Sequence, residues 1–134
     1  MRVRTRVVLL VVIVVAGIAL AVWTQVRPLI DAGQASSIAL DIQAGPDHTG
    51  WRVASATVDY NGNRPRINLP GFRDSPKCWG ASLPVGDGYC LPYPVWRVHV
   101  VGTVPAGQCI DVIDFVDARK ARVAVSLGGS GSCG

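Results

Sequence analysis

The chain has 134 residues, thirteen basic side chains, nine acidic side chains and a formal net charge of +4. Arg2, Arg4 and Arg6 supply three of the positive charges, so residues 24–134 hold ten basic against nine acidic side chains, a net charge of +1. That balance lacks the basic stripe needed to bind DNA or RNA, and we expect no nucleic-acid partner. Arginine far outnumbers lysine, a composition typical of GC-rich bacterial genomes.

The first predicted element is a transmembrane helix over residues 7–23, which are only Val, Leu, Ile, Ala, Gly and Trp. A helix of this length spans about 26 Å, at the short end for a bilayer core. The arginines before it predict a cytoplasmic N-terminus. We therefore expect residues 1–27 to be a cytoplasmic stub and single-pass membrane anchor, and residues 28–134 to form one extracytoplasmic domain.

A cleaved secretory signal is the alternative for this segment. Ala19-Leu20-Ala21 offers a small-x-small cleavage site after a shorter apolar core, and cleavage near Ala21 would release a secreted protein. The apolar run continues through Val22 and Trp23, which favours the retained anchor. Both interpretations place the remaining chain outside the cytoplasm.

Four cysteines follow the apolar run: Cys78, Cys90, Cys109 and Cys133. An even number in an exported chain predicts two disulfides, with three possible pairings. Proximity in the sequence favours Cys78–Cys90 and Cys109–Cys133. A zinc site is the weaker alternative because the chain has no Cys-x-x-Cys pair.

One amphipathic helix is predicted between Asp31 and Gly45. Asp31 and Gln34 have the spacing of a capping box, and Gly45-Pro46 ends the helix. The predicted core face carries Ala35, Ile38, Ala39 and Ile42, and the predicted outer face carries Ser36, Ser37, Asp41 and Gln43.

Strand-forming residues occupy 51–60, and Asn61-Gly62 then predicts a hairpin turn. The return strand, 64–69, contains Pro65, so we expect it at the edge of the sheet.

Three further strands are expected at 95–101, 109–116 and 121–127. In the first, Trp96, Val98 and Val100 alternate with Arg97 and His99. The second does not alternate strictly, which predicts a β-bulge near Val112 and Ile113. In the third, Val123, Val125 and Leu127 are expected to face inward, and a flexible tail follows. The whole pattern predicts an α+β domain, one helix packed on an antiparallel sheet of roughly five strands.

The long segment 70–94 reads as a loop, pinned by the predicted Cys78–Cys90 bond. It carries four aromatic residues, Phe72, Trp79, Tyr89 and Tyr93, which are the candidate partner-binding residues. The alternative is that these rings pack back on the sheet as a small satellite core.

The candidate catalytic groups do not form a recognisable motif. His48 and His99 are the two histidines, and Ser75, Ser82 and Ser126 lack the context of a nucleophile elbow. Asp111, Asp114 and Asp117 recur every three residues, but a strand sends the first two to opposite faces, unlike the ligands of a calcium loop. We expect no catalytic residue, no metal and no cofactor.

Two segments resemble PepSY-type domains. Residues 31–60 begin with DAGQASSIAL and continue with WRVASATV, similar to the helix-then-strand opening of that family. Residues 94–127 contain PVWRVHVVGTV and CIDVIDFVDARKARVAV, which resemble its C-terminal half. The chain departs from the family where Lys120-Ala121 replaces a Thr-Gly turn, since Ala adopts positive φ poorly.

The resemblance implies a non-catalytic extracytoplasmic module of the kind proposed to restrain peptidases. Together with the residues above, it predicts a membrane-anchored binding or regulatory protein, not an enzyme, whose partner is an exported peptidase, an envelope enzyme or another extracytoplasmic protein or peptide. The alternatives are a structural envelope or pilin-like subunit and a small secreted hydrolase.

Overall fold

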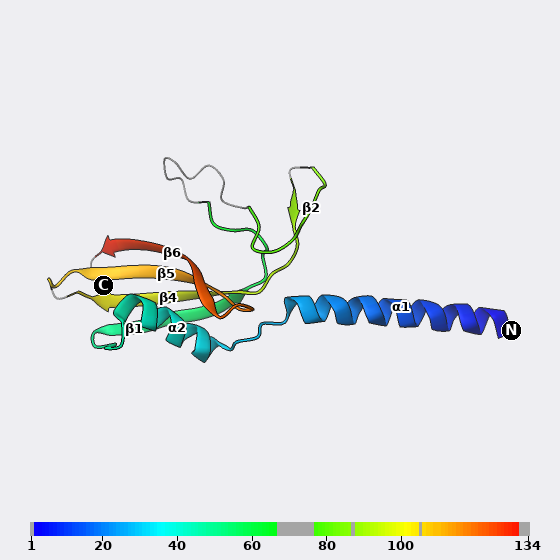
Figure 1. Ribbon diagram of the computed structural model, residues 1–134, viewed down its shortest axis with the longest axis horizontal. Coiled ribbons are helices and arrows are strands. Elements are labelled where there is room, and N and C mark those ends of the chain that lie inside the picture. The colour runs from blue at the N-terminus through cyan, green and yellow to red at the C-terminus, as the bar shows by residue number, and fades with distance from the viewer. Residues whose placement is uncertain (1, 67–76, 87, 105, 132–134) are drawn as a thin grey trace.

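The computed structural model describes residues 2–66, 77–86, 88–104 and 106–131 (Figure 1). A long helix, α1 (Arg2–Val26), leads into a small domain in which one helix packs on an antiparallel sheet. A short arm leaves the domain beside the end of α1 (Figure 1). The predicted α+β architecture is confirmed.

The α1 helix has apolar side chains on all sides. Val3–Val26 has a mean hydropathy of 3.0 and none of it is buried, so it is long and apolar enough to cross a membrane. A signal sequence near an N-terminus passes the same test of length and apolar composition. The predicted helix is confirmed, as one that could span a membrane or be a signal sequence.

The second helix, α2 (Ala32–Ala44), begins and ends as its local sequence predicts. The Asp31 carboxylate accepts from Gln34 N at 2.8 Å, and the Gln34 side chain accepts from Asp31 N at 3.0 Å. Gly45 ends the helix with a φ of 68°. The buried face was predicted only in part, because Ile42 is 57% exposed while Gln43 is half-buried and turned toward the sheet.

The main sheet has four antiparallel strands in the order β1-β4-β5-β6. Their bounds are β1 Trp51–Asp59, β4 Val95–Thr103, β5 Cys109–Asp117 and β6 Arg122–Gly131. One face packs on α2 through a core of small and branched side chains: Ala35, Ala39, Val98, Val100 and Val116. Close packing is possible because the two fully buried residues of α2 are alanines.

The predicted hairpin at Asn61-Gly62 is wrong. The antiparallel partner of β1 is β4, and residues 64–66 form no strand, while 67–69 lie outside the described residues. A Cβ on Gly62 would lie 2.0 Å from the Leu91 carbonyl oxygen, so this glycine permits a close crossing of two chain segments. Among the described residues that follow it, Asn63 forms an isolated antiparallel bridge with Cys78.

The predicted bulge near Val112 and Ile113 is also wrong, because β5 pairs with β4 without interruption. Side chains of β5 alternate strictly between the two faces of the sheet, and Asp114 is therefore buried on the same face as Val112 and Val116. The bulges lie in the edge strands instead, between Val53 and Ser55 in β1 and opposite the Phe115/Val116 step in β6.

The bulge in β6 changes which face its side chains occupy. Val123 packs in the core against α2, but Val125 and Leu127 pair with Phe115 and Ile113 on the opposite face. Val123, Val125 and Leu127 were all expected to face inward. The expectation is correct for Val123 and wrong for Val125 and Leu127. The strand also continues to Gly131, beyond its predicted end at Leu127.

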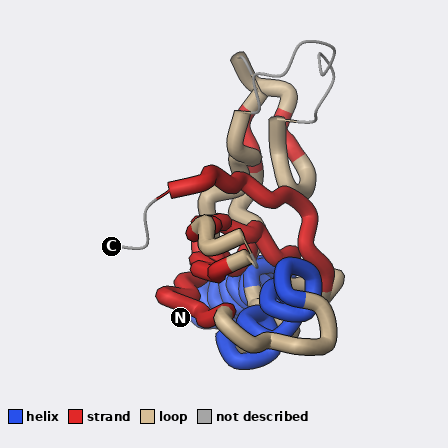
Figure 2. The backbone as a smooth tube through the Cα atoms, turned by 90° about the vertical axis from the view of Figure 1, so that its left-hand side faces the viewer, coloured by secondary structure: helices blue, strands red, loops and turns tan. Residues whose placement is uncertain are grey.

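The described part of the predicted loop, residues 77–86 and 88–93, forms a projecting arm (Figures 1 and 2). It contains a two-stranded hairpin, β2 (Ser82–Leu83) and β3 (Tyr89–Cys90), which the sequence did not predict. The Cys78–Cys90 disulfide closes its base, with 5.3 Å between the Cα atoms. Cys133 lies outside the described residues, so the Cys109–Cys133 bond stays a prediction.

Candidate binding surfaces

Trp79 fixes the arm to the sheet face opposite α2. Its ring stacks on Phe115 of β5, with the centroids 5.9 Å apart and the planes at 29°. The Arg64 guanidinium lies 4.8 Å from the Trp79 centroid, a cation–π contact. Trp79 is half-buried, so its ring serves mainly to hold the arm in place.

Tyr93 fixes the other end of the arm. Its hydroxyl donates to the Asp117 carboxylate at 3.0 Å, and its ring contacts the backbone at Gly80, where a Cβ would lie 2.6 Å from a ring carbon. Burial, followed by the hydrogen bond to Asp117 and its charge, raises the pKa of Tyr93 to about 12. Asp117 also accepts from the backbone N–H groups of Arg119 and Lys120, at 2.9 and 3.0 Å.

Of the candidate aromatic residues that the structure describes, Tyr89 has the side chain that is open to solvent, at 75% exposure. Phe72 lies outside the described residues. Sequence reasoning missed the side chains that accompany Tyr89 on the hairpin, namely Leu83, Val85 and Leu91, which are all exposed. Their apolar character within a loop rich in Pro and Gly was the available signal.

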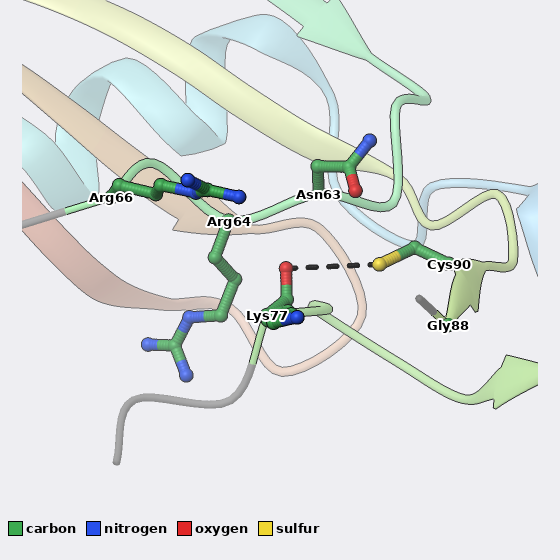
Figure 3. Close-up of a pocket in the computed structure, with 6 residues that line it drawn as sticks. All are labelled: Asn63, Arg64, Arg66, Lys77, Gly88 and Cys90. Atoms are coloured by element: carbon green, nitrogen blue, oxygen red, sulfur yellow. Dashed lines mark hydrogen bonds between the residues drawn. The ribbon is translucent and has the colours of Figure 1, made fainter. Parts of the chain in front are cut away.

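A basic cavity of about 260 Å³ opens at the base of the arm (Figure 3). Its described lining residues are Asn63, Arg64, Arg66, Lys77, Gly88 and Cys90. Three are cationic and none is acidic, so the cavity suits an anion. The Cys90 Sγ lies 3.7 Å from the Lys77 carbonyl oxygen, but a disulfide sulfur has no proton, so this is a packing contact.

The sheet face opposite α2, which we call the open face, is covered only in part by the arm. Ile113, Phe115 and Val125 are half-buried there, and Leu127 is 36% exposed. A shallow depression of about 470 Å³ runs beside the end of β6, lined by Asp111, Ile113 and Leu127 together with residues 128–131. Branched side chains beside a glycine-rich strand form a surface on which an extended chain can lie.

Asp114 is fully buried under α2 and was not expected there. Gln43 Nε2 donates to both carboxylate oxygens, at 2.9 and 3.1 Å, and Ser126 Oγ donates to one of them. Burial raises the pKa of Asp114 despite these donors. The three side chains tie α2, β5 and β6 together across the core.

The candidate catalytic and metal-binding groups do not converge. His48 pairs with Asp41 at 2.8 Å, and His99 pairs with Asp111 on the open face. The Ser126–Asp114 contact is completed by an amide, not by a histidine. Among the described residues, no group of three or more His, Cys, Asp or Glu side chains could hold a metal ion. Ser82 lies on β2, and Ser75 is outside the described residues.

The α1 helix is tied to the domain by hydrogen bonds at its C-terminal end. Arg119 Nη1 donates to the Thr24 and Gln25 carbonyls, at 2.9 and 2.6 Å, where helix carbonyls lack internal partners. Leu29 N donates to the Ala118 carbonyl at 2.9 Å, and Trp96 Nε1 donates to the Ile30 carbonyl at 3.0 Å. These bonds fix the direction in which the domain leaves α1.

Neither a scan of protein-family models nor searches of curated proteins and of solved structures find a match to this chain. The resemblance to PepSY-type domains therefore stays an expectation based on the two sequence segments.

Proposed function

We propose that the protein is a membrane-anchored, extracytoplasmic binding module without catalytic activity, and that it captures a protein or peptide partner on its open face. The observation that carries the proposal is the uncovered apolar surface around Ile113 and Leu127, directly beside edge strand β6. An extended peptide can add to such an edge through backbone hydrogen bonds while neighbouring side chains supply specificity.

The geometry of β6 supports this mode of binding. Within the described residues no strand pairs with its outer edge. Its last part includes Gly128, Gly129 and Gly131, and a Cβ on Gly129 or Gly131 would meet no atom within 4 Å. The bulge at the start of β6 disturbs pairing there, so we expect the partner to lie along residues 125–131.

We further propose that the partner is an exported peptidase or another envelope enzyme, which the module restrains. The PepSY resemblance motivates this choice. The Arg119 contacts to the end of α1 support it, because they hold the domain in one direction from the membrane and so favour a partner that also works at the membrane surface.

The test is cross-linking in intact cells followed by capture of the tagged full-length protein. Leu127→Asp should abolish the recovered partner because it places a charge in the apolar depression. The matched control is Ile42→Asp, an exposed aliphatic position of α2 on the other side of the sheet, which should leave recovery unchanged. Equal recovery from both variants would remove the open face from the proposal, and recovery of self-cross-links alone would favour a structural subunit.

A further inference from the structure

The hairpin of the arm presents a rigid apolar tip. Leu83, Val85, Tyr89 and Leu91 are 47%, 65%, 75% and 39% exposed. The pairing of Ser82 with Cys90 and of Leu83 with Tyr89, and the disulfide at the base, hold the backbone in place. Clustered apolar side chains on a constrained projection mark an interaction surface, and fixing them on contact costs little entropy.

The arm lies at the depth of the end of α1. Figure 1 shows its hairpin level with the C-terminal end of α1 along the helix axis, and Figure 2 shows it projecting sideways from that helix. Trp23, 65% exposed, and Arg27 mark this end as the membrane–water interface if α1 spans the membrane. The hydrogen bonds from Arg119 to Thr24 and Gln25 join the domain that carries the arm to this end of α1.

The charges around the base of the arm match a lipid surface. Arg64, Arg66 and Lys77 line the basic cavity, with no acidic side chain among its described lining residues (Figure 3). Lipid phosphates carry the complementary charge, and each cation near an anionic bilayer strengthens binding.

From these observations we propose that the arm is a second membrane contact. Leu83, Val85, Tyr89 and Leu91 enter the extracytoplasmic interface, while Arg66 and Lys77 bind the phosphates of anionic lipids. The sequence places Asp87 between Val85 and Tyr89, and a carboxylate is costly in hydrocarbon, so the contact is at headgroup depth.

Two attachment points fix the rotation of the domain about α1, which one helix alone does not. The open face would then meet its partner in one orientation at the membrane surface. The contact requires that α1 remains attached, but it does not depend on the proposed partner of the open face.

The test uses full-length protein in vesicles with a photo-reactive phenylalanine analogue at position 85 or 89. The matched control position is Gln108, in the exposed turn between β4 and β5 at the end of the domain away from α1 (Figure 1). Lipid adducts at positions 85 and 89 should exceed those at 108 by tenfold or more. Equal yields at all three positions, or adducts to protein alone, would overturn the proposal. Intact mass shows that α1 is retained in the sample.

A second comparison tests the cations. Vesicles of phosphatidylcholine with one-third phosphatidylglycerol should give several-fold more adduct at position 89 than phosphatidylcholine alone. Arg66→Gln combined with Lys77→Gln should remove that increase, whereas Arg52→Gln, at an exposed position of strand β1, should preserve it. An increase that survives the double substitution would exclude the basic cavity and overturn the lipid-phosphate part of the proposal.

Discussion

The two faces of the sheet are built differently. The face under α2 is closed by alanines and valines and contains a fully buried carboxylate whose donors come from α2 and β6. The open face carries larger side chains, Ile113, Phe115 and Leu127, that are only half-buried or exposed. The first arrangement stabilises the fold, and the second leaves apolar area free for binding. Neighbouring residues of one strand therefore differ in what a substitution should change.

The largest effect is expected at Asp114 on the covered face. Asp114→Ala should lower the free energy of unfolding by about 3 kcal/mol, because the half-buried Gln43 amide and the Ser126 hydroxyl would both lose their hydrogen bonds to a charged acceptor. Denaturant unfolding of the full-length protein in detergent measures this. Asp114→Asn keeps an acceptor oxygen and should stay within about 1 kcal/mol of the wild type. An equal loss in both variants would show that the charge, not the hydrogen bonds, matters.

The pH dependence sharpens this prediction. The pKa of Asp114 is raised in the folded state, so the unfolded state holds fewer protons above pH 4 and the ionised carboxylate destabilises the fold at neutral pH. Stability of the wild type relative to Asp114→Asn should therefore rise as the pH falls from 7 toward about 4. A difference that is constant over this range would contradict the burial of an ionisable group.

A smaller effect is expected at Trp79, on the open face. Trp79→Ala removes the stack on Phe115 and the cation–π contact with Arg64, and should cost about 2 kcal/mol. Hydrogen exchange should show faster exchange in the arm, while β4 and β5 stay protected. Trp79→Phe is the control, since it keeps a ring against Phe115. Loss of protection throughout the sheet would mean that the two faces are not independent.

Tyr93→Phe should cost about 1 kcal/mol, because it deletes one hydrogen bond to the buried Asp117 carboxylate. The folded-state pKa of Tyr93 is raised to about 12, above its ordinary value, so the stability it contributes is complete below pH 10 and is lost as the pH rises toward 12. Unfolding curves between pH 9 and 11.5 should fall more steeply for the wild type than for the variant. Parallel curves would show that Tyr93 does not cause the loss of stability at high pH.

The smallest effect is expected at the turn that leads into β6. Ala121 has a φ of 50°, a conformation that glycine adopts without strain. Ala121→Gly should therefore stabilise the protein by about 0.5 kcal/mol. Thermal unfolding measures the change, and a lower melting temperature would show that the turn is not strained.

Features encoded by neighbouring residues were predictable. The capping box of α2 joins residues three apart, and Gly45 stops the helix where expected. The apolar α1, the approximate bounds of β4 and β5, and the close Cys78–Cys90 pair are equally local. Of the aromatic candidates that the structure describes, sequence could not separate Trp79 and Tyr93, which pack, from Tyr89, which is exposed.

Contacts between distant residues decided the rest. Gln43 and Asp114 are 71 positions apart, and their hydrogen bond allows a carboxylate to occupy a core position that alternation alone would give to an apolar residue. β1 pairs with β4 and not with the described residues that follow Asn61-Gly62, and the β6 bulge turned Val125 and Leu127 to the open face. The sequence by itself determined the helices and most strand segments, because propensities and caps act within a few residues. Only tertiary structure decided the strand partners, the buried polar group and the exposed surfaces, because their free energies depend on segments that meet only after folding.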